Sequence, residues 1–352
     1  MKNIFKLLAF LPLLTACDDL FEPALENNRD LEAMYKEPSY AQGILANAYI
    51  ILPYETSPTS DLATDDAVTN EISSNYLRMA TGSWTANNNP VSQWQNRFNA
   101  IQYINLFLEN VDKVEWAKDE RISTMFLDRL KGEAYGLRAL HMYYLLRAHG
   151  GKIADGTLMG VPIILKSEGP DADFNHARAT YSDCVKQIME DADKAIELLP
   201  LDYKKFADSE IPEKYKNIGV TNASDYRRVC GEEYRGLMSG RIALAVRAQT
   251  ALLAASPAFQ SGSGMTWEQA ADYAAEIIEK ANGGGGCGLD ADGLEWYTLA
   301  DKDYGTGGSP AEVIWRSSTD DNNTLETANF PPSLYGNGRV NPTQNLVDAF
   351  PM

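Results

Sequence analysis

The chain has 352 residues, of which 31 are Lys or Arg and 49 are Asp or Glu, so its formal net charge is −18. This surplus of negative charge repels phosphate backbones and anionic headgroups, and we therefore expect no nucleic-acid partner. The acids are spread along the chain rather than gathered in one tail, which is typical of a solvated surface. Hydrophobic residues make up 44% of the chain, which is ordinary for a globular protein with a large core.

The N-terminus has the pattern of a signal peptide. Lys2 and Lys6 come before an apolar run over residues 7–14, which is too short for a membrane-spanning helix of about 20 residues. Residues 14–17, Leu-Thr-Ala-Cys, resemble a bacterial lipobox. We predict a lipoprotein signal peptide over 1–16, a lipid on Cys17 and a polar tether over 17–37. The alternative is an ordinary secretory signal with a chance cysteine.

Helical periodicity dominates the rest of the chain. Apolar residues recur at steps of three and four, which is typical of amphipathic helices. Pro90 and Thr266 are suited to helix starts. Gly132 and Gly136 lie inside one long helical pattern and indicate that another backbone packs closely there. The pattern predicts helices over residues 39–52, 94–111, 122–148, 185–199, 242–255 and 267–281.

The helices are separated by long irregular stretches. Segments 193–200 and 267–274 carry half-signatures of the tetratricopeptide repeat. A regular solenoid would not need the long connections at 53–90, 152–179, 202–236 and 283–340. Short strands are predicted at 161–165 and 313–317. The predicted fold class is mostly α: a tetratricopeptide-like helical-pair scaffold with long irregular loops, where binding residues usually lie, and a few short strands.

Four cysteines are too few for a disulfide framework. With Cys17 carrying lipid, Cys184, Cys230 and Cys287 remain, and no two of them have CxxC spacing. One disulfide is compatible with an exported protein, but the sequence does not select the pair. Cys184 lies on a helical pattern, so we expect a small buried apolar residue.

A co-linear set of motifs resembles the SusD/RagB family, the surface glycan-binding lipoproteins of Bacteroidota. No single motif decides, but the set spans essentially the whole chain. It comprises the lipobox at Cys17, the loop 61–67, the helix opened by Trp94, residues 133–139 and 143–151, Val161-Pro162, Tyr181, residues 191–196, residues 312–315 and the ending 341–350.

The resemblance implies a binding protein at the outer cell surface. Family members cover a SusC-like TonB-dependent porin in the outer membrane and help to capture oligosaccharides for import. Some relatives bind peptides instead. The resemblance implies one SusD-like helical domain over residues 38–352. In the family, a further segment of the fold follows the motif at 341–350, so this domain is expected to be incomplete at its C-terminal end.

Candidate glycan-binding residues lie in the predicted loops. A neutral sugar offers hydroxyl groups and a weakly apolar C–H face, so its binding needs exposed aromatic rings with amides and carboxylates. In the alternative interpretation, Trp84 packs on the core, the asparagines form turns, and the charged residues cap turns or pair with each other. The candidates are Asp65, Asp66, Arg78, Trp84, Asn87, Asn88, Asn89, Trp296, Tyr297, Tyr304 and Tyr335.

The remaining tryptophans are interpreted as structural. Trp94 and Trp267 fit apolar helix stripes, and Trp116 also belongs to a helix. Trp315 lies on a predicted short strand, where a place in the core is favoured over a ligand contact.

Signs of catalysis are few. His141 lies on a helix stripe and is expected to be a satisfied core residue, His149 lies at a helix C-terminus that favours it, and His176 lies in a loop. HExxH, GxSxG and Walker sequences do not occur. We therefore expect a protein that is not an enzyme and holds no metal or cofactor. Two alternatives stay open: a helical-repeat scaffold that binds only protein or peptide, and a lipid-anchored glycosidase, because 49 acids supply many carboxylate pairs.

Overall fold

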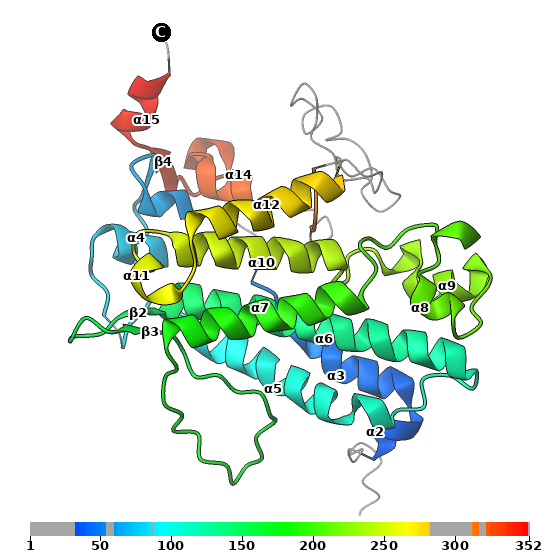
Figure 1. The fold of residues 1–352 in the computed structure, drawn as a ribbon. Helices are drawn as coiled ribbons and strands as arrows, with labels where there is room; N and C mark the ends of the chain where they lie inside the picture. Colours follow the sequence, from blue (N-terminus) through cyan, green and yellow to red (C-terminus); the bar gives the residue numbers. More distant parts are fainter. Residues whose placement is uncertain (1–31, 54–59, 86, 282–311, 317–321, 351–352) are drawn as a thin grey trace, which may run out of the picture.

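The computed structural model describes residues 32–53, 60–85, 87–281, 312–316 and 322–350 (Figure 1). The α-helices are α2 (Ala33–Lys36), α3 (Pro38–Ile50), α4 (Asn75–Ala80), α5 (Trp94–Asn110), α6 (Glu120–His149), α7 (Tyr181–Leu198), α8 (Glu213–Lys216), α9 (Ala223–Cys230), α10 (Gly240–Ala255), α11 (Gln260–Ser263), α12 (Trp267–Ala281), α14 (Thr324–Asn329) and α15 (Gln344–Ala349). The 3₁₀ helices are η2 (Ser60–Ala63), η3 (Val111–Lys113), η4 (Asp208–Glu210), η5 (Glu232–Tyr234) and η7 (Pro332–Leu334). The strands are β1 (Ala67–Thr69), β2 (Gly151–Lys152), β3 (Leu158–Met159) and β4 (Val340–Pro342).

Six helices form a stack in chain order, and they are the six that the sequence pattern predicts. Contacts join α3 to α5, α5 to α6, α6 to α7, α7 to α10 and α10 to α12. In Figure 1 they run alongside one another, from the blue α3 near the bottom to the yellow α12 near the top. One apolar cluster, which includes Ile104, Leu137 and Ile188, runs through the stack. The mostly helical, paired-helix fold class is confirmed.

The folded body begins before residue 38. Helix α2 lies within the segment 17–37 that was predicted to be a tether, and its Met34 is fully buried. The hydroxyl of Tyr35 donates to Oδ1 of Asn110 at 3.0 Å, which ties α2 to the end of α5. The last residues of the predicted tether are therefore part of the helical body.

Side chains cap the starts of three of the long helices, α6, α7 and α10. The Oγ1 of Thr180 accepts the N–H of Asp183 at 3.0 Å at the start of α7, and Ser239 caps α10 in the same way. Asp119 caps α6 by accepting the N–H of Arg121 at 2.9 Å. Each cap satisfies an N–H group that the first turn of a helix leaves without an intrahelical partner.

Gly132 and Gly136 in α6 make room for side chains, and not for another backbone as the sequence suggested. A Cβ at Gly132 would lie 2.6 Å from Cγ of Leu199. A Cβ at Gly136 would lie 2.6 Å from Cγ of Met238. Leu199, at the end of α7, therefore packs directly against Gly132, and Met238, before α10, packs directly against Gly136.

A buried ion pair joins three helices of the stack. Nε and Nη2 of Arg138 on α6 donate to the two carboxylate oxygens of Asp191 on α7 at 2.7 and 2.8 Å. Nη1 of Arg138 donates to Oδ1 of Asn105 on α5 at 3.0 Å. Because both charges are buried, each depends on the other for compensation.

Residues 202–236, predicted to be irregular, build a second small core. Within this segment, Ile211, Tyr215 and Tyr226 pack against Ile122 and Met125 in the first turns of α6. The segment supplies η4, α8, α9 and η5, which lie beyond one end of the stack in Figure 1.

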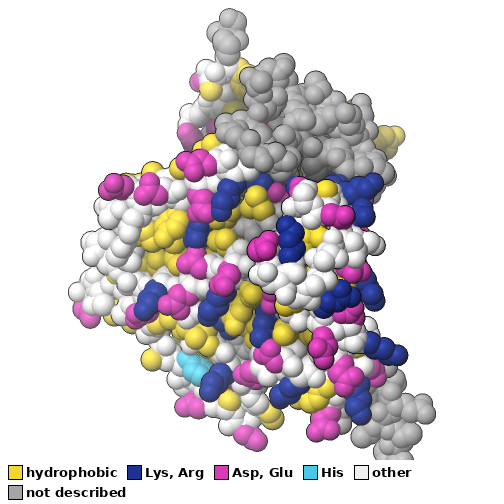
Figure 2. Space-filling model, turned by 45° about the vertical axis from the view of Figure 1, so that its right-hand side comes forward, with side chains coloured by type: hydrophobic (Ala, Val, Ile, Leu, Met, Phe, Trp, Pro, Cys, Tyr) yellow, Lys and Arg dark blue, Asp and Glu magenta, His cyan; other side chains and the backbone are white. Residues whose placement is uncertain are grey.

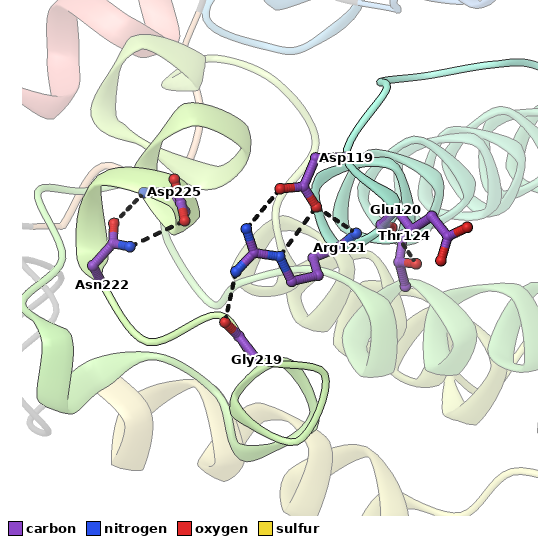
Figure 3. Close-up of polar contacts among 7 residues, drawn as sticks. All are labelled: Asp119, Glu120, Arg121, Thr124, Gly219, Asn222 and Asp225. Atoms are coloured by element: carbon purple, nitrogen blue, oxygen red, sulfur yellow. Dashed lines mark hydrogen bonds and ion pairs between the residues drawn. The ribbon is translucent and has the colours of Figure 1, made fainter.

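Arg121 ties this second core to the start of α6. Figure 3 shows its guanidinium bonded to the carboxylate of Asp119 and to the carbonyl of Gly219, with Nη2–Oδ2 at 2.6 Å and Nη1–O at 2.8 Å. The hydrogen bond from Arg121 lowers the pKa of Asp119 to about 2, since it stabilises the ionised carboxylate. The capping carboxylate therefore stays charged over the whole neutral range.

The two predicted strands are wrong for the residues that the structure describes. Residues 312–316 are irregular. Residues 161–165 form no ladder, although the carbonyl of Val161 accepts the N–H of Ala179 at 3.2 Å, because side chains of α7 and α5 bond other polar groups of this run. The N–H of Val161 lies 3.4 Å from Sγ of Cys184, and that thiol lies 3.3 Å from the carbonyl of Val161. The hairpin nearby is instead formed by β2 and β3.

Polar side chains of α5 hold the loop that follows β3, drawn in green below the stack in Figure 1. Most of the hydrogen bonds between α5 and this loop are made to main-chain groups of the loop. They join Gln102 to the N–H and C=O of Glu168, Asn105 to the carbonyls of Ile164 and Lys166, and Glu109 to the N–H of Ser167, all between 2.8 and 3.1 Å.

Strands β1 and β4 bring together two segments that are far apart in the sequence. The strands are antiparallel, with Val68 opposite Asn341. Nη1 of Arg339 lies 2.9 Å from Oε1 of Glu71, beside this pair. Residues 65–71 and 338–343 therefore meet, and we call the two segments that flank this contact, 60–90 and 322–350, the loop end of the molecule.

Candidate functional site

The turn that presents Trp84 is a helix C-cap built around Gly82. The N–H of Ser83 donates to the carbonyl of Arg78 at 3.0 Å, and the N–H of Gly82 donates to the carbonyl of Met79 at 3.1 Å. This pair of bonds is a Schellman motif, whose turning residue is left-handed, and Gly82 has a φ of 64°. Trp84 thus follows a helix end of fixed geometry, to which Arg78 contributes its carbonyl.

Trp84 and the asparagines after it form an exposed turn. Trp84 is 49% exposed, so it does not pack into the core. Thr85 and Asn88 face each other across the turn, and the N–H of Asn88 donates to the carbonyl of Thr85 at 3.0 Å. Asn89 uses its Oδ1 to accept a backbone N–H at 3.0 Å, so it is a turn former. The exposed amides of Asn87 and Asn88 have no partner among the described residues and are free for a ligand.

Asp65 and Asp66 lie where the two segments of the loop end meet. Their carbonyls accept hydrogen bonds from Thr343, that of Asp66 from the N–H at 2.8 Å and that of Asp65 from the hydroxyl. Both residues are exposed, and no described side chain bonds either carboxylate. The side chain of Arg78 is partly buried on α4 and pairs with neither aspartate. The two carboxylates are therefore available to a ligand.

Tyr335 is the most exposed aromatic side chain of the described residues, at 97%. It has a φ of 65° and is the one residue other than glycine with a left-handed backbone in the described ranges. For a residue with a Cβ this conformation costs about 1–2 kcal/mol, and such residues concentrate at functional sites. Tyr335 precedes β4, so the β1–β4 pairing places its segment at the loop end with Asp65 and Asp66.

Four of the predicted site residues lie outside the described residues. They are Cys17, Trp296, Tyr297 and Tyr304. The signal peptide over 1–16 lies outside as well. Their roles remain predictions.

All four other tryptophans of the described residues were predicted to be structural, but only two of them pack in or on the core. Trp116 is buried and its Nε1 donates to the carbonyl of Val111 at 3.2 Å, so it is structural as expected, but it lies between η3 and α6 and not in a helix as predicted. Trp315 packs on the core, although not from a strand, and its Nε1 donates to the carbonyl of Gly236 at 2.8 Å. Trp94 and Trp267 are 42% and 49% exposed, so neither belongs to the core as the stripe pattern predicted. Each is the first residue of its helix, where the neighbouring helices leave the ring partly uncovered.

His141 is the satisfied core residue that the sequence predicts. Its Nε2 lies 3.1 Å from the carbonyl of Ala48, and its Nδ1 lies 3.1 Å from Nη1 of Arg97. Burial, together with the charge of Arg97, lowers the pKa of His141 to about 3. The ring is therefore neutral, so Nδ1 accepts from Arg97 and Nε2 donates to Ala48.

His149 is the last residue of α6, at the helix C-terminus where the sequence places it, but its ring is held by a hydrogen bond from another segment. Its Nε2 accepts the N–H of Gln93 at 3.0 Å, which requires an unprotonated nitrogen. Burial and the nearby charge of Arg178 lower its pKa. The ring packs edge-on against Trp94 at 5.3 Å. Sequence reasoning missed this contact between the start of α5 and the end of α6, since the two residues are far apart in the chain.

The described residues offer no arrangement for metal chemistry. No three His, Cys, Asp or Glu side chains of the described part are placed to hold a metal ion. Cys184 and Cys230 are free and buried, which confirms the expectation for Cys184. Burial raises the pKa of Cys230 to about 12, so its thiol is protonated at neutral pH. No helix of the described ranges is long and apolar enough to cross a membrane.

A family model matches more than half of the chain. The match covers residues 25–214, and the family is SusD-like, described as "Starch-binding associating with outer membrane". The chain belongs to the SusD-like family. No match was found among curated proteins.

Solved SusD-like structures share the fold. A SusD-like protein from Bacteroides fragilis is 18% identical, with a TM-score of 0.62 over 94% of this chain and 56% of that one. A SusD superfamily protein from Parabacteroides distasonis is 17% identical, with a TM-score of 0.61 over 89% and 60%. A laminarin-binding SusD-like protein is 18% identical, with a TM-score of 0.52 over 76% and 50%. The chain thus spans between 50 and 60% of the length of these three proteins.

Proposed function

We propose that this protein is a cell-surface glycan-binding lipoprotein that captures oligosaccharides with its loop end. The observation that carries the proposal is the fixed turn after α4, which holds Trp84 exposed beside the unpaired amides of Asn87 and Asn88. Membership of a family described as starch-binding, and the fold shared with a laminarin-binding protein, support the same ligand class.

The loop end has the side chains that a neutral saccharide needs. The indole of Trp84 gives a flat apolar surface for the C–H face of a pyranose ring. The amides of Asn87 and Asn88 both donate and accept, as the hydroxyls of a sugar do, while the carboxylates of Asp65 and Asp66 accept. Tyr335 adds a second exposed ring from the other segment of the loop end.

The proposed place of action is the outer surface of the outer membrane. The lipobox at Cys17 supports a lipid anchor, and the family description supports association with the outer membrane. The proposed partner is a SusC-like TonB-dependent transporter, to which the protein would deliver the oligosaccharide. The proposed role is binding without catalysis, for which the unpaired, exposed polar groups of the loop end are suited.

Affinity electrophoresis through gels that contain neutral polysaccharides tests the proposal. The mature chain with Cys17→Ser is compared with the same chain carrying Trp84→Ala or Trp267→Ala. Trp267 is a matched control, because both tryptophans are 49% exposed and Trp267 lies on α12 rather than at the loop end. We expect retardation by at least one polysaccharide, weakened about tenfold by Trp84→Ala, as loss of about 1.4 kcal/mol of stacking predicts.

Three outcomes would contradict the proposal. Folded protein that no polysaccharide retards would favour a scaffold that binds only protein or peptide. Equal losses from Trp84→Ala and Trp267→Ala would remove Trp84 from the site. Release of reducing sugar during incubation would favour a lipid-anchored glycosidase.

A further inference from the structure

A pocket of about 440 Å³ lies on the side of the stack and is lined by no residue of the loop end. It is bounded by α5, α6, α7 and the loop that α5 holds. Trp94 begins α5 and Leu108 is near its end, so the pocket lies about 20 Å along this helix from the Trp94 end. Pockets of this size bind small molecules. The lining residues are Leu108, Glu109, Tyr135, Arg138, Leu165, Lys166 and Lys194.

Two lysines of this pocket lack an anionic partner. Among the described residues, no carboxylate lies within ion-pair distance of Nζ of Lys166 or Lys194. By contrast, the ammonium groups of Lys131, Lys204 and Lys214 lie 2.6, 2.7 and 3.2 Å from carboxylate oxygens. Other exposed lysines of the described residues, such as Lys118 and Lys152, also have no such partner, but Lys166 and Lys194 adjoin the same pocket.

The pocket has one further cation, which is already paired, and one carboxylate, which is hydrogen-bonded. Arg138 lies at its floor, with Asp191 bound to its guanidinium. Glu109 faces the loop, where its Oε1 and Oε2 accept the N–H and the hydroxyl of Ser167 at 2.8 and 2.5 Å. Glu109 keeps its negative charge, but it is turned to the loop, and the two lysines outnumber it, so the lining carries a net positive charge.

Contacts within the protein hold parts of the pocket before a ligand arrives. Nζ of Lys194 lies 4.9 Å from the ring centre of Tyr135, and the guanidinium carbon of Arg138 lies 5.4 Å from the same centre. The main chain of Lys166 is held by Asn105 at 3.1 Å. Such preorganisation reduces the entropy that binding has to oppose. Leu108 and Leu165 add apolar surface that suits the C–H groups of a sugar.

We propose that this pocket binds the carboxylate of an acidic saccharide, a uronic acid residue. The pocket is large enough for a short sugar segment, and it joins two unpaired ammonium groups to apolar walls. Figure 2 shows acidic and basic side chains interspersed over one face of the molecule, so an anionic glycan needs a local cationic site of this kind. The inference rests on the proposed function for its ligand class, but it concerns a different site.

Isothermal titration with tetragalacturonate tests the pocket. Its fully methyl-esterified form is the neutral control, since it keeps the same sugar and linkage and lacks the charge. The protein variants are Lys166→Gln/Lys194→Gln and the control Lys186→Gln, an exposed lysine on the same helix α7 as Lys194. At 0.15 M salt the Debye length is about 8 Å, so the nearby lysines dominate over distant acids.

We expect tetragalacturonate to bind, its ester to bind at least about fivefold more weakly, and Lys166→Gln/Lys194→Gln to lose the same factor. Lys186→Gln and Trp84→Ala should leave this binding unchanged. Equal binding of acid and ester, an unaffected double variant, or equally tight binding of a tetraglutamate peptide would overturn the proposal. So would absence of tetragalacturonate binding. Retardation by a neutral polysaccharide that Trp84→Ala abolishes would show, independently, whether the proposed function holds.

Discussion

The helical stack and the loop end place their polar and aromatic side chains in opposite ways. In the stack, Arg138 and His141 are at most 5% exposed, and each is bonded to neighbouring helices. At the loop end, Ile72, Trp84 and Tyr335 are 88%, 49% and 97% exposed. The difference separates two tasks: the stack supplies stability through buried partners, while the loop end leaves side chains available to a ligand at little cost to stability.

The sharpest test of this separation compares two ion pairs, one from each region. Arg138→Met leaves the carboxylate of Asp191 buried and unpaired, and we expect it to lower the free energy of unfolding by about 3–5 kcal/mol. Arg339→Met breaks the exposed pair with Glu71, and we expect a loss of about 0–1 kcal/mol. Urea denaturation followed by circular dichroism measures both.

A double variant identifies the cause of the larger loss. Asp191→Asn added to Arg138→Met removes the buried charge, so most of the stability should return. Two results would show that the stack does not depend on this pair. One is an equal fall in the free energy of unfolding from Arg138→Met and from Arg339→Met. The other is a double variant Arg138→Met/Asp191→Asn that is no more stable than Arg138→Met.

The second test uses pH and His141. The pKa of His141 is lowered from 6.5 to about 3 in the folded protein, so the unfolded chain takes up the proton first on acidification. The stability due to the neutral ring is complete above pH 6.5 and is lost progressively between about pH 6.5 and 3. Between pH 7 and 5 this loss is on the order of 2 kcal/mol.

This loss of stability is measured from the urea midpoints of the wild type and of His141→Asn at several pH values between 7 and 5. The variant should be less stable at pH 7 and should show a flatter decline with acid. Parallel curves would mean that the ring is not held neutral by burial.

The smallest effect is expected at Tyr335. Tyr335→Gly removes an exposed ring and places a residue without Cβ at a φ of 65°, so the free energy of unfolding should rise by at most about 1 kcal/mol. Binding of a neutral polysaccharide should weaken at the same time if Tyr335 contacts it. Thermal unfolding measures the change in stability, and affinity electrophoresis on the same samples measures the change in polysaccharide binding. A clear loss of stability would show that Tyr335 supports the fold instead.

The helices were predictable because their signals are local. The three- and four-residue periodicity of α6 and α7, and caps such as Thr180, depend on neighbouring residues in the sequence. Trp84 is exposed, which agrees with one of the two alternatives that the sequence left open, and the Schellman turn around Gly82 that precedes it is a local motif. These features need no knowledge of distant parts of the chain.

The remaining features depend on contacts between distant residues. The run 161–165 has a strand-like composition, but Cys184 on α7 and Asn105 on α5 take its polar groups. His149 has a helix C-terminal position, but Gln93 donates to it from another segment. Pairing of β1 with β4 joins residues more than 270 positions apart in the chain. A single sequence carries no direct signal for such pairs.

The loop anchored on α5 has one consequence for variation within this fold. Gln102, Asn105 and Glu109 recognise the loop almost entirely through main-chain N–H and C=O groups, which every residue except proline provides in full. The loop can therefore exchange its side chains, Lys166 included, without any compensating change in the helix. The helix holds the main chain of the loop in place whatever its side chains are. Substitutions in this one short loop can therefore change which chemical groups line this side of the molecule.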